Sequence, residues 1–324
     1  GGGAVSQRKK VLVFRALPPD LLARIEAVHD VQQADPRRPE QVPRFRELLA
    51  DAQGMIGSSV KVGAAELALA PKLEVISSIS VGVDNYDLAA MKARGLLLCH
   101  TPGVLTETTA ATVFSPVLLA SRRLVELANH VREGRWTRNI GEELFGWDVH
   151  GKTLGILGFA RIGQAVARRA ALGFGMPVRY HDPFDVKPPA ELAAGCKPAS
   201  LDELLATADI VACTLPLSNE TRQMMNAARF AQMKPGAIFV NGSRGGIVDE
   251  AALVAALDAG HLRAAALDVF ATEPLPLDSP LRTHPKLTPL PHIGSATHET
   301  RRRMAELATD NLLQALPGER PACS

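Results

Sequence analysis

The sequence is short of aromatic residues and of any large excess of charge. Aromatic residues make up 4% of its 324 positions, and 36 Lys and Arg stand against 34 Asp and Glu, so the formal net charge is only +2. Nucleic-acid binding usually needs a basic face, and this balance therefore disfavours a nucleic-acid partner. No apolar run approaches the ~18–20 residues that span a bilayer, so we expect no membrane partner either.

Cysteines are also scarce. The chain has four, Cys99, Cys196, Cys213 and Cys323, which lie far apart and form no CxxC pair. Their spacing argues against a metal site and against a disulfide framework, and it fits a reducing compartment. The first ten residues contain no apolar stretch of the kind that secretory signals carry, so we expect a cytoplasmic protein.

Short apolar runs recur along the chain and alternate with helical patterns. We predict strands over residues 11–14, 73–77, 96–99, 153–157, 177–181, 210–213, 237–240 and 264–267. Helical patterns such as residues 162–172 and 250–257 separate most of these runs. This alternation is typical of an α/β fold, in which helices cover a doubly wound parallel sheet. At ~150 residues per domain, the length predicts two domains.

Two long helical stretches interrupt the alternation, and we place the domain crossovers there. One covers residues 105–132 and contains Pro116, which should kink the helix near the preceding residue. The other covers residues 295–316, after a proline-rich stretch. We therefore predict one discontinuous domain of residues 1–103 and 294–324, and a second domain of residues 104–293.

A glycine-rich turn follows the predicted strand at 153–157. It reads Gly158-Phe-Ala160-Arg-Ile-Gly163, a G-x-G-x-x-G pattern with alanine in the middle. Such a turn points backbone N–H groups and a helix N-terminus at a pyrophosphate. Asp182 ends the next predicted strand, where a carboxylate accepts hydrogen bonds from an adenosine ribose. The order of these elements favours a dinucleotide, with S-adenosylmethionine as the main competing ligand and a tight turn without a ligand as the plainer interpretation.

Four further polar residues follow predicted strands downstream, namely Arg244, Asp268, Glu273 and His292. Ligands bind outside the carboxyl ends of strands in this fold, so these side chains can converge on one crevice. Each alone could be an ordinary surface, helix-start or loop residue. Together they supply what carbonyl reduction beside a nicotinamide requires: a cation for a carboxylate, a His that moves a proton, and an acid that sets its tautomer.

These motifs resemble the D-isomer-specific 2-hydroxyacid dehydrogenase family. The resemblance runs from about residue 54 to 316 and rests on the glycine turn and on four tracts: Ser80-Val-Gly-Val-Asp-Asn85, residues 241–250, Asp268-Val-Phe-x-x-Glu-Pro and Pro291-His-Ile-Gly. Residues 101–107, 173–177 and 292–300 look most like the bacterial glyoxylate/hydroxypyruvate reductases that also reduce 2-ketogluconate. The resemblance implies two Rossmann- or flavodoxin-like domains with a deep cleft, and reduction of a small 2-keto acid to the D-2-hydroxy acid.

The resemblance also implies a role for each matching residue. Arg244, Glu273 and His292 would be catalytic: Arg244 would bind the substrate, and His292 would be the proton donor in reduction, with Glu273 as its partner. The amides of Val81 and Gly82 would hold the substrate carboxylate in the domain of residues 1–103 and 294–324. The cofactor would contact Thr109, Gly158, Arg161, Ile162, Gly163, Asp182, Thr214, Pro216, Thr221, Gly242, Ser243, Asp268, His292, Gly294 and Ser295.

The residues after the strand at 177–181 favour NAD(H), with NADP(H) left possible. Asp182 and Asp185 place two carboxylates there with no adjacent Arg, and the nearby cations are Arg179 and Lys187. A carboxylate accepts hydrogen bonds from the ribose hydroxyls and repels a 2′-phosphate. Ala160 departs from the motif at its middle glycine, and its methyl group could weaken cofactor binding.

Three further features of the sequence concern the assembly, the alternative functions and the size of the substrate. Residues 134–147 match the arm that relatives use for dimer contact, which implies a homodimer, although Trp136 and Trp147 could equally be core residues. The same fold also serves nucleotide-sensing, corepressor-like proteins and dehydrogenases for other 2-hydroxy acids, such as D-3-phosphoglycerate or D-lactate. We expect Ser58, Ser59 and Val60 to influence the size of the 2-keto acid that is reduced.

Overall fold

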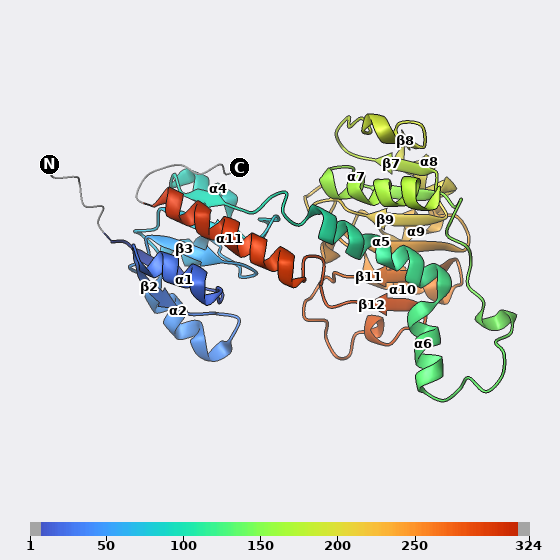
Figure 1. The fold of residues 1–324 in the computed structure, drawn as a ribbon, viewed down its shortest axis with the longest axis horizontal. Coiled ribbons are helices and arrows are strands. Elements are labelled where there is room, and N and C mark those ends of the chain that lie inside the picture. The colour runs from blue at the N-terminus through green and yellow to red at the C-terminus, as the bar shows by residue number, and fades with distance from the viewer. Residues whose placement is uncertain (1–7, 317–324) are drawn as a thin grey trace. The chain divides into compact units, whose positions relative to one another are not determined.

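The computed structural model describes residues 8–316 and divides the chain into two compact units. The first unit runs to Leu105 and resumes at Ala296, and the second covers Thr106–Ser295. Each unit is built on its own parallel β-sheet (Figure 1). The chain is therefore an α/β protein, as its alternating pattern predicts.

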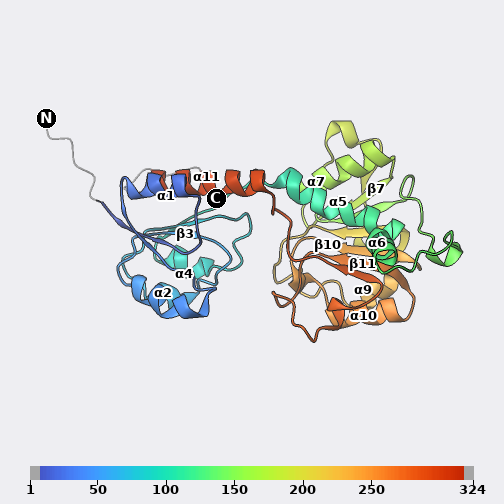
Figure 2. The same cartoon turned by 60° about the horizontal axis from the view of Figure 1, so that its bottom comes forward.

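The first unit contains a five-stranded sheet in the order β2-β1-β3-β4-β5. Helices α1 and α11 cover one face of this sheet, and α2 and α4 cover the other (Figure 2). Successive strand residues point to opposite faces, so Leu12 packs with Phe45 of α2 while Val11 and Val13 join the cluster that contains Leu312 of α11. The elements are β1 (Lys10–Val13), α1 (Pro19–Glu26), β2 (Asp30–Gln33), α2 (Val42–Leu48), β3 (Gly54–Gly57), α3 (Ala64–Ala68), β4 (Val75–Ser78), α4 (Leu88–Ala93), β5 (Leu97–Cys99) and α11 (His298–Ala315).

The second unit contains a seven-stranded sheet in the order β12-β11-β10-β9-β6-β7-β8. The chain adds β7 and β8 on one side of β6 and then β9 to β12 on the other, so the order reverses between β6 and β9. Dinucleotides bind at such a switch point, outside the carboxyl ends of the strands. The strands are β6 (Leu154–Leu157), β7 (Val178–His181), β8 (Cys196–Pro198), β9 (Ile210–Cys213), β10 (Ala237–Asn241), β11 (Leu262–Leu267) and β12 (Leu287–Pro289).

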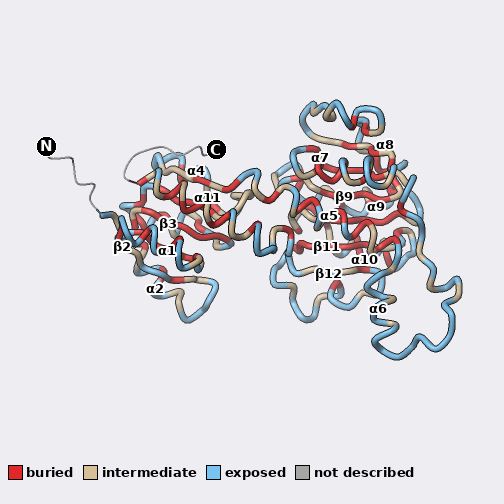
Figure 3. The backbone as a smooth tube through the Cα atoms, viewed as in Figure 1, coloured by how far each residue is buried: buried red, intermediate tan, exposed pale blue. Residues whose placement is uncertain are grey.

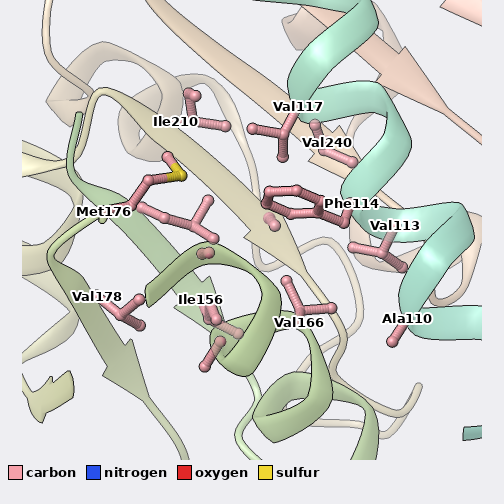
Figure 4. Packing of buried hydrophobic residues seen from close by; sticks show 14 of the residues in the cluster. Ala110, Val113, Phe114, Val117, Ile156, Val166, Met176, Val178, Ile210 and Val240 are labelled. Atoms are coloured by element: carbon pink, nitrogen blue, oxygen red, sulfur yellow. The ribbon is translucent and has the colours of Figure 1, made fainter. Parts of the chain in front are cut away.

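Helices cover both faces of this second sheet. Phe114 and Val117 of α5 pack with Val166 of α7 against Ile156 and Val240 of the sheet (Figure 4). A separate buried cluster joins α8, α9 and α10 to the opposite face. The helices are α5 (Thr106–Arg122), α6 (Leu124–Arg132), α7 (Arg161–Arg168), α8 (Leu201–Thr207), α9 (Ala227–Gln232) and α10 (Glu250–Asp258). Single turns of 3-10 or π-helix occur at Pro39–Gln41, Glu142–Leu144, Arg169–Gly173, Ala190–Leu192, Gly245–Ile247 and Pro280–Arg282.

The long helix predicted for residues 105–132 is broken at a different place from the one we expected. Helix α5 continues through Pro116, which is buried inside it, and ends at Arg122. The break lies at Arg123, whose backbone is left-handed with a φ of 57°. The Arg123 guanidinium bonds the Glu126 carboxylate at 2.7 Å and the Glu143 carbonyl at 2.6 Å, and these contacts hold the new direction of α6.

The structure decides the alternative left open for Trp136 and Trp147: they are not core residues, because their exposed fractions are 58% and 53%. Cys196 and Cys213 are buried free thiols, but Cys99 is disulfide-bonded, which the spacing of the cysteines did not predict; Cys323 lies outside the described residues. Among residues 8–316, no helix is both long and apolar enough to cross a membrane.

Candidate active site

The turn between β6 and α7 brings three backbone segments into contact. Gly158 has a φ of 94°, and a side chain there would place its Cβ 2.8 Å from the Leu215 nitrogen. A Cβ at Gly163 would overlap the Gly158 carbonyl oxygen. Both positions therefore require glycine, and the close approach leaves the first amides of α7 at the carboxyl edge of the sheet. These amides suit a pyrophosphate.

The middle position of the turn does not require glycine. Ala160 is the N-cap of α7, is exposed, and has ordinary extended backbone with a φ of −79°. The departure from the G-x-G-x-x-G pattern therefore leaves the fold of the turn intact.

Asp182 links the glycine turn to the loop after β7. Its Oδ2 accepts a hydrogen bond of 2.6 Å from the Phe159 N–H, and its Oδ1 accepts one of 2.9 Å from the Phe184 N–H. The Phe159 ring stacks on Tyr180 of β7 with 3.8 Å between the ring centroids. The carboxylate is thus fixed in place, and each of its oxygens keeps a lone pair for a ribose hydroxyl.

The loops after β9 and β10 complete this edge of the second sheet. Thr214 donates a hydrogen bond of 2.7 Å from Oγ1 to the Gly158 carbonyl, across the switch point. Thr221 donates one of 2.7 Å to the Pro216 carbonyl, which folds the loop after β9 back on itself. After β10, the Ser243 hydroxyl lies 2.9 Å from Asn241 Oδ1. The fit of these residues to a dinucleotide rests on the glycine cradle and on the fixed carboxylate of Asp182.

A second group of residues surrounds His292. Its Nδ1 lies 2.9 Å from Glu273 Oε2, and its backbone is left-handed with a φ of 55°. Left-handed backbone is uncommon outside glycine and often marks a functional loop. The other Glu273 oxygen accepts a hydrogen bond of 3.2 Å from the Phe270 N–H, so the carboxylate is held from both sides. An ionised Glu273 accepts a hydrogen bond from Nδ1–H of His292, which leaves Nε2 to face a substrate.

Charge explains the protonation states in this group. Burial alone would raise the pKa of Glu273, but the hydrogen bond and charge of His292 and the charge of Arg244 outweigh it, so this pKa lies below its usual value. The pKa of Asp268 is raised, chiefly by burial, although the Ile293 N–H and the charge of His292 oppose the shift. Glu273 is therefore ionised, and the positive charge of Arg244 acts directly on it.

Asp268 and Thr109 fix the loop that follows His292. Asp268 Oδ1 accepts a hydrogen bond of 2.7 Å from the Ile293 N–H, and its side chain is buried. Thr109 of α5 donates from Oγ1 to the Gly294 carbonyl at 3.2 Å. One turn further along α5, Val113 lies so close to Gly242 that a Cβ at Gly242 would overlap it. The second unit thus brings together Arg244, Asp268, Glu273, His292 and Gly294.

Val81 and Gly82 lie in the first unit, in the loop after β4. A chain of hydroxyl groups supports this loop: Tyr86 donates to Ser78 at 2.7 Å, the Ser78 and Ser80 hydroxyls lie 2.6 Å apart, and Ser80 donates to the Gly82 carbonyl at 2.8 Å. Tyr86 and Ser78 are buried. The Val81 carbonyl also lies 3.0 Å from His100 Nδ1. The loop of Val81 and Gly82 is therefore anchored to the buried Tyr86 through Ser78 and Ser80.

Comparison with known proteins assigns the family. Residues 114–294, more than half of the chain, match the family model described as "D-isomer specific 2-hydroxyacid dehydrogenase, NAD binding domain". The chain belongs to the D-isomer-specific 2-hydroxyacid dehydrogenase family. The resemblance seen in the sequence is thereby confirmed.

Relatives in this family match over nearly the whole chain. The chain is 52% identical over 311 residues to "Glyoxylate/hydroxypyruvate reductase B" of Klebsiella pneumoniae (strain 342), which covers 96% of each protein. Among solved structures, it matches the TT0316 protein of Thermus thermophilus with a TM-score of 0.88 and 43% identity, covering 97% of this chain and 99% of that one. It also matches an NADPH-dependent glyoxylate/hydroxypyruvate reductase of Sinorhizobium meliloti, solved with NADP and malonate, with a TM-score of 0.82, 31% identity, and coverage of 95% and 93%.

The structure of this dehydrogenase also shows a residue that sequence reasoning missed. Glu250, in the first turn of α10, accepts a hydrogen bond of 2.9 Å from the Ala271 N–H. Burial raises the pKa of Glu250, and the nearby charge of Glu273 raises it further. An acid at a helix start is usually a capping residue, so only the contact itself shows that Glu250 supports the Glu273 loop. Among residues 8–316, no group of three or more His, Cys, Asp or Glu side chains could hold a metal.

The hydroxyl chain under Val81 and Gly82 leads to a test. Tyr86→Phe removes the first donor of the chain without changing the packing of the ring, so the loop should open more readily and the free energy of unfolding should fall by about 1 kcal/mol. Amide hydrogen exchange at Val81 and Gly82 should become faster. The matched control is Tyr180→Phe, which removes a hydroxyl that donates to Val186 in the second unit. Equal exchange at Val81 and Gly82 in Tyr86→Phe and the native protein would show that the chain does not support the loop.

Proposed function

We propose that this chain reduces a small 2-keto acid, such as glyoxylate or hydroxypyruvate, to the D-2-hydroxy acid with a reduced nicotinamide dinucleotide. The observation that carries the proposal is the 2.9 Å hydrogen bond between His292 and Glu273, with the charge of Arg244 acting on the same carboxylate. The names of the relatives at about half identity support the substrate class. Membership of the family supports the cofactor class.

Each catalytic side chain has a distinct task in this proposal. A bound reduced dinucleotide supplies the hydride to the keto carbon. His292 donates the Nε2 proton to the keto oxygen, and ionised Glu273 stabilises the imidazolium before the transfer. Arg244 binds the substrate carboxylate through its guanidinium and polarises the keto group. We infer that the amides of Val81 and Gly82, in the first unit, bind the same carboxylate.

The cofactor is held, in this proposal, by the carboxyl edge of the second sheet. The turn amides bind the pyrophosphate because they are the unpaired donors at a helix N-terminus. Asp182 binds the adenosine ribose, and Asp268 faces the nicotinamide amide. The remaining proposed contacts are Thr109, Gly158, Arg161, Ile162, Gly163, Thr214, Pro216, Thr221, Gly242, Ser243, His292, Gly294 and Ser295.

The activity is tested by mixing the protein with NADH or NADPH and glyoxylate or hydroxypyruvate and following the nicotinamide absorbance. His292→Asn keeps a residue that tolerates left-handed backbone and removes the proton donor, so kcat should fall by roughly 10²- to 10⁴-fold. Glu273→Gln should move the alkaline limb of the reduction profile to lower pH, because the imidazolium loses its negative partner.

The matched control for these variants is His284→Asn, because His284 also pairs with a carboxylate, that of Asp258, at 2.7 Å. Its kcat should be unchanged. Near-native glyoxylate reduction by His292→Asn would contradict the assignment. Tight NADH binding without turnover of any 2-keto acid would favour a nucleotide-sensing protein instead.

We further propose that the chain prefers NADH to NADPH. Asp182 is fixed by two backbone N–H groups, and a fixed carboxylate repels a 2′-phosphate. The expected preference is about 2–4 kcal/mol, or roughly 30- to 800-fold in kcat/KM. Asp182→Asn should narrow the ratio by at least ~10-fold, while Asp185→Asn, an exposed carboxylate in the same loop, should change it less. A native preference for NADPH would contradict the role given to Asp182.

We also propose that the protein is a homodimer. Helix α6 and the chain after it extend away from the second sheet and are mostly exposed (Figures 1 and 3). Large apolar side chains that are at least 40% exposed gather there: Leu124, Val125, Val131, Trp136, Ile140, Phe145 and Trp147. An apolar surface of this kind is typical of a protein interface. A cavity of about 430 Å³ is lined by Val125, Phe145 and Trp147 of this surface.

Sedimentation equilibrium tests the dimer. The native protein should sediment at twice the mass of the chain, and Val131→Asp should shift it toward the monomer because a buried unpaired charge is costly. Leu172→Asp places the same charge at a side chain that is 62% exposed outside this segment, and it should leave the mass unchanged. A native monomer would contradict the proposal.

A further inference from the structure

The guanidinium of Arg15 is held in place at the carboxyl edge of the first sheet. Arg15 follows β1, is half-buried, and donates from Nη1 to the Ser58 hydroxyl at 2.6 Å and to the Ser59 hydroxyl at 3.2 Å. Ser58 is buried, and Ser59 has a left-handed φ of 61°. Within residues 8–316, Nε and Nη2 of Arg15 donate no hydrogen bond.

The charges of three neighbouring residues act on Arg15. Burial lowers the pKa of Arg15, and the positive charges of Arg37 and Arg301 lower it further, while Asp35 raises it. Asp35 is already paired with Arg37 through hydrogen bonds of 2.7 and 3.0 Å. Arg15 forms no ion pair with any residue that the structure describes. A guanidinium with unused N–H donors is well suited to bind a carboxylate or a phosphate.

Sheet order places this guanidinium close to the loop of Val81 and Gly82. Strand β3 lies between β1 and β4, and neighbouring strands are ~4.8 Å apart. Ser58 and Ser59 follow β3, the neighbour of β4, so the anchored guanidinium and the loop of Val81 and Gly82 lie at the same carboxyl edge of the first sheet. A ligand whose carboxylate meets the Val81 and Gly82 amides therefore lies on the edge that carries the Arg15 guanidinium.

We infer that Arg15 is a specificity-determining residue that selects 2-keto acids with a second anionic group, a carboxylate or a phosphate, at the end remote from the keto acid carboxylate. The inference rests on the proposed function, because it assigns the far end of the same substrate. Val60 and Ser59 set the size of the substrate at this edge, and Arg15 sets its charge.

The test compares substrates that differ only in the second anion. One pair is 2-ketoglutarate and 2-ketovalerate, and the other is 3-phosphohydroxypyruvate and hydroxypyruvate. The native enzyme should have the higher kcat/KM for the doubly anionic member of at least one pair, and which pair responds tells a carboxylate from a phosphate. Glyoxylate, which has no far end, is the internal control.

Variants at Arg15 separate charge recognition from support of the loop. Arg15→Gln keeps an N–H donor for the two serines and removes the charge, so kcat/KM for the doubly anionic substrate should fall about 10- to 100-fold, with less than ~3-fold change for glyoxylate. Arg15→Lys should recover part of the selectivity. Arg24→Gln removes an exposed charge of the same unit that pairs with Asp310, and it should alter neither substrate.

The outcomes are distinct. Equal losses for glyoxylate and the doubly anionic substrate in Arg15→Gln would make Arg15 a support of the loop and overturn the inference. No native preference in either pair would overturn it too, while glyoxylate reduction would still uphold the proposed function. Absence of turnover with every 2-keto acid would overturn both.

Discussion

The close approach of α7 to β6 is the constraint on which the rest of the second unit depends. Two glycines allow it: Gly158 lies against the chain after β9, and Gly163 lies against the Gly158 carbonyl. Once the helix is this close, its first amides reach the sheet edge, Asp182 can bind the Phe159 N–H, and Thr214 can bind Gly158. A local backbone requirement thus fixes three loops from three different strands. The first amides of α7, Asp182 and Thr214 are therefore positioned by contacts within the protein itself.

Hydrogen bonds between side chains and the backbone of neighbouring loops hold the acid–base pair of His292 and Glu273 in place. Gly245 is so close to Phe270 that a side chain there would overlap the Phe270 backbone. Glu250, Glu273 and Asp268 each accept a backbone N–H from the loops around them. Three carboxylates in one small region would repel each other if they were left in water-poor surroundings. A backbone N–H donates a hydrogen bond to each of them, and the charges of His292 and Arg244 stabilise Glu273 further. These interactions offset the repulsion between the three carboxylates.

Strands with a clear apolar run could be predicted from the sequence, and strands without one could not. All eight predicted strands are present, because their apolar runs match strands that are largely buried in the sheets. Strands β2, β8 and β12 were missed because none of them has an apolar run: they read Asp-Val-Gln-Gln, Cys-Lys-Pro and Leu-Thr-Pro. Strand β3 is buried but has only two large residues between glycines. The order of motifs indicated the ligand class, whereas the hydrogen bonds of Asp182, Tyr86 and Arg15 join residues whose pairing no local pattern reveals.

Arg123, whose backbone is left-handed, separates the packed core of the second unit from the segment 124–148, where substitutions affect that core less. No residue of the segment 124–148 belongs to either buried cluster of that unit. Substitutions at its exposed positions leave the packing of α5 against the sheet unchanged, because α5 has already ended at Arg122. The surface that residues 124–148 expose can therefore be redesigned separately from the buried core of the second unit.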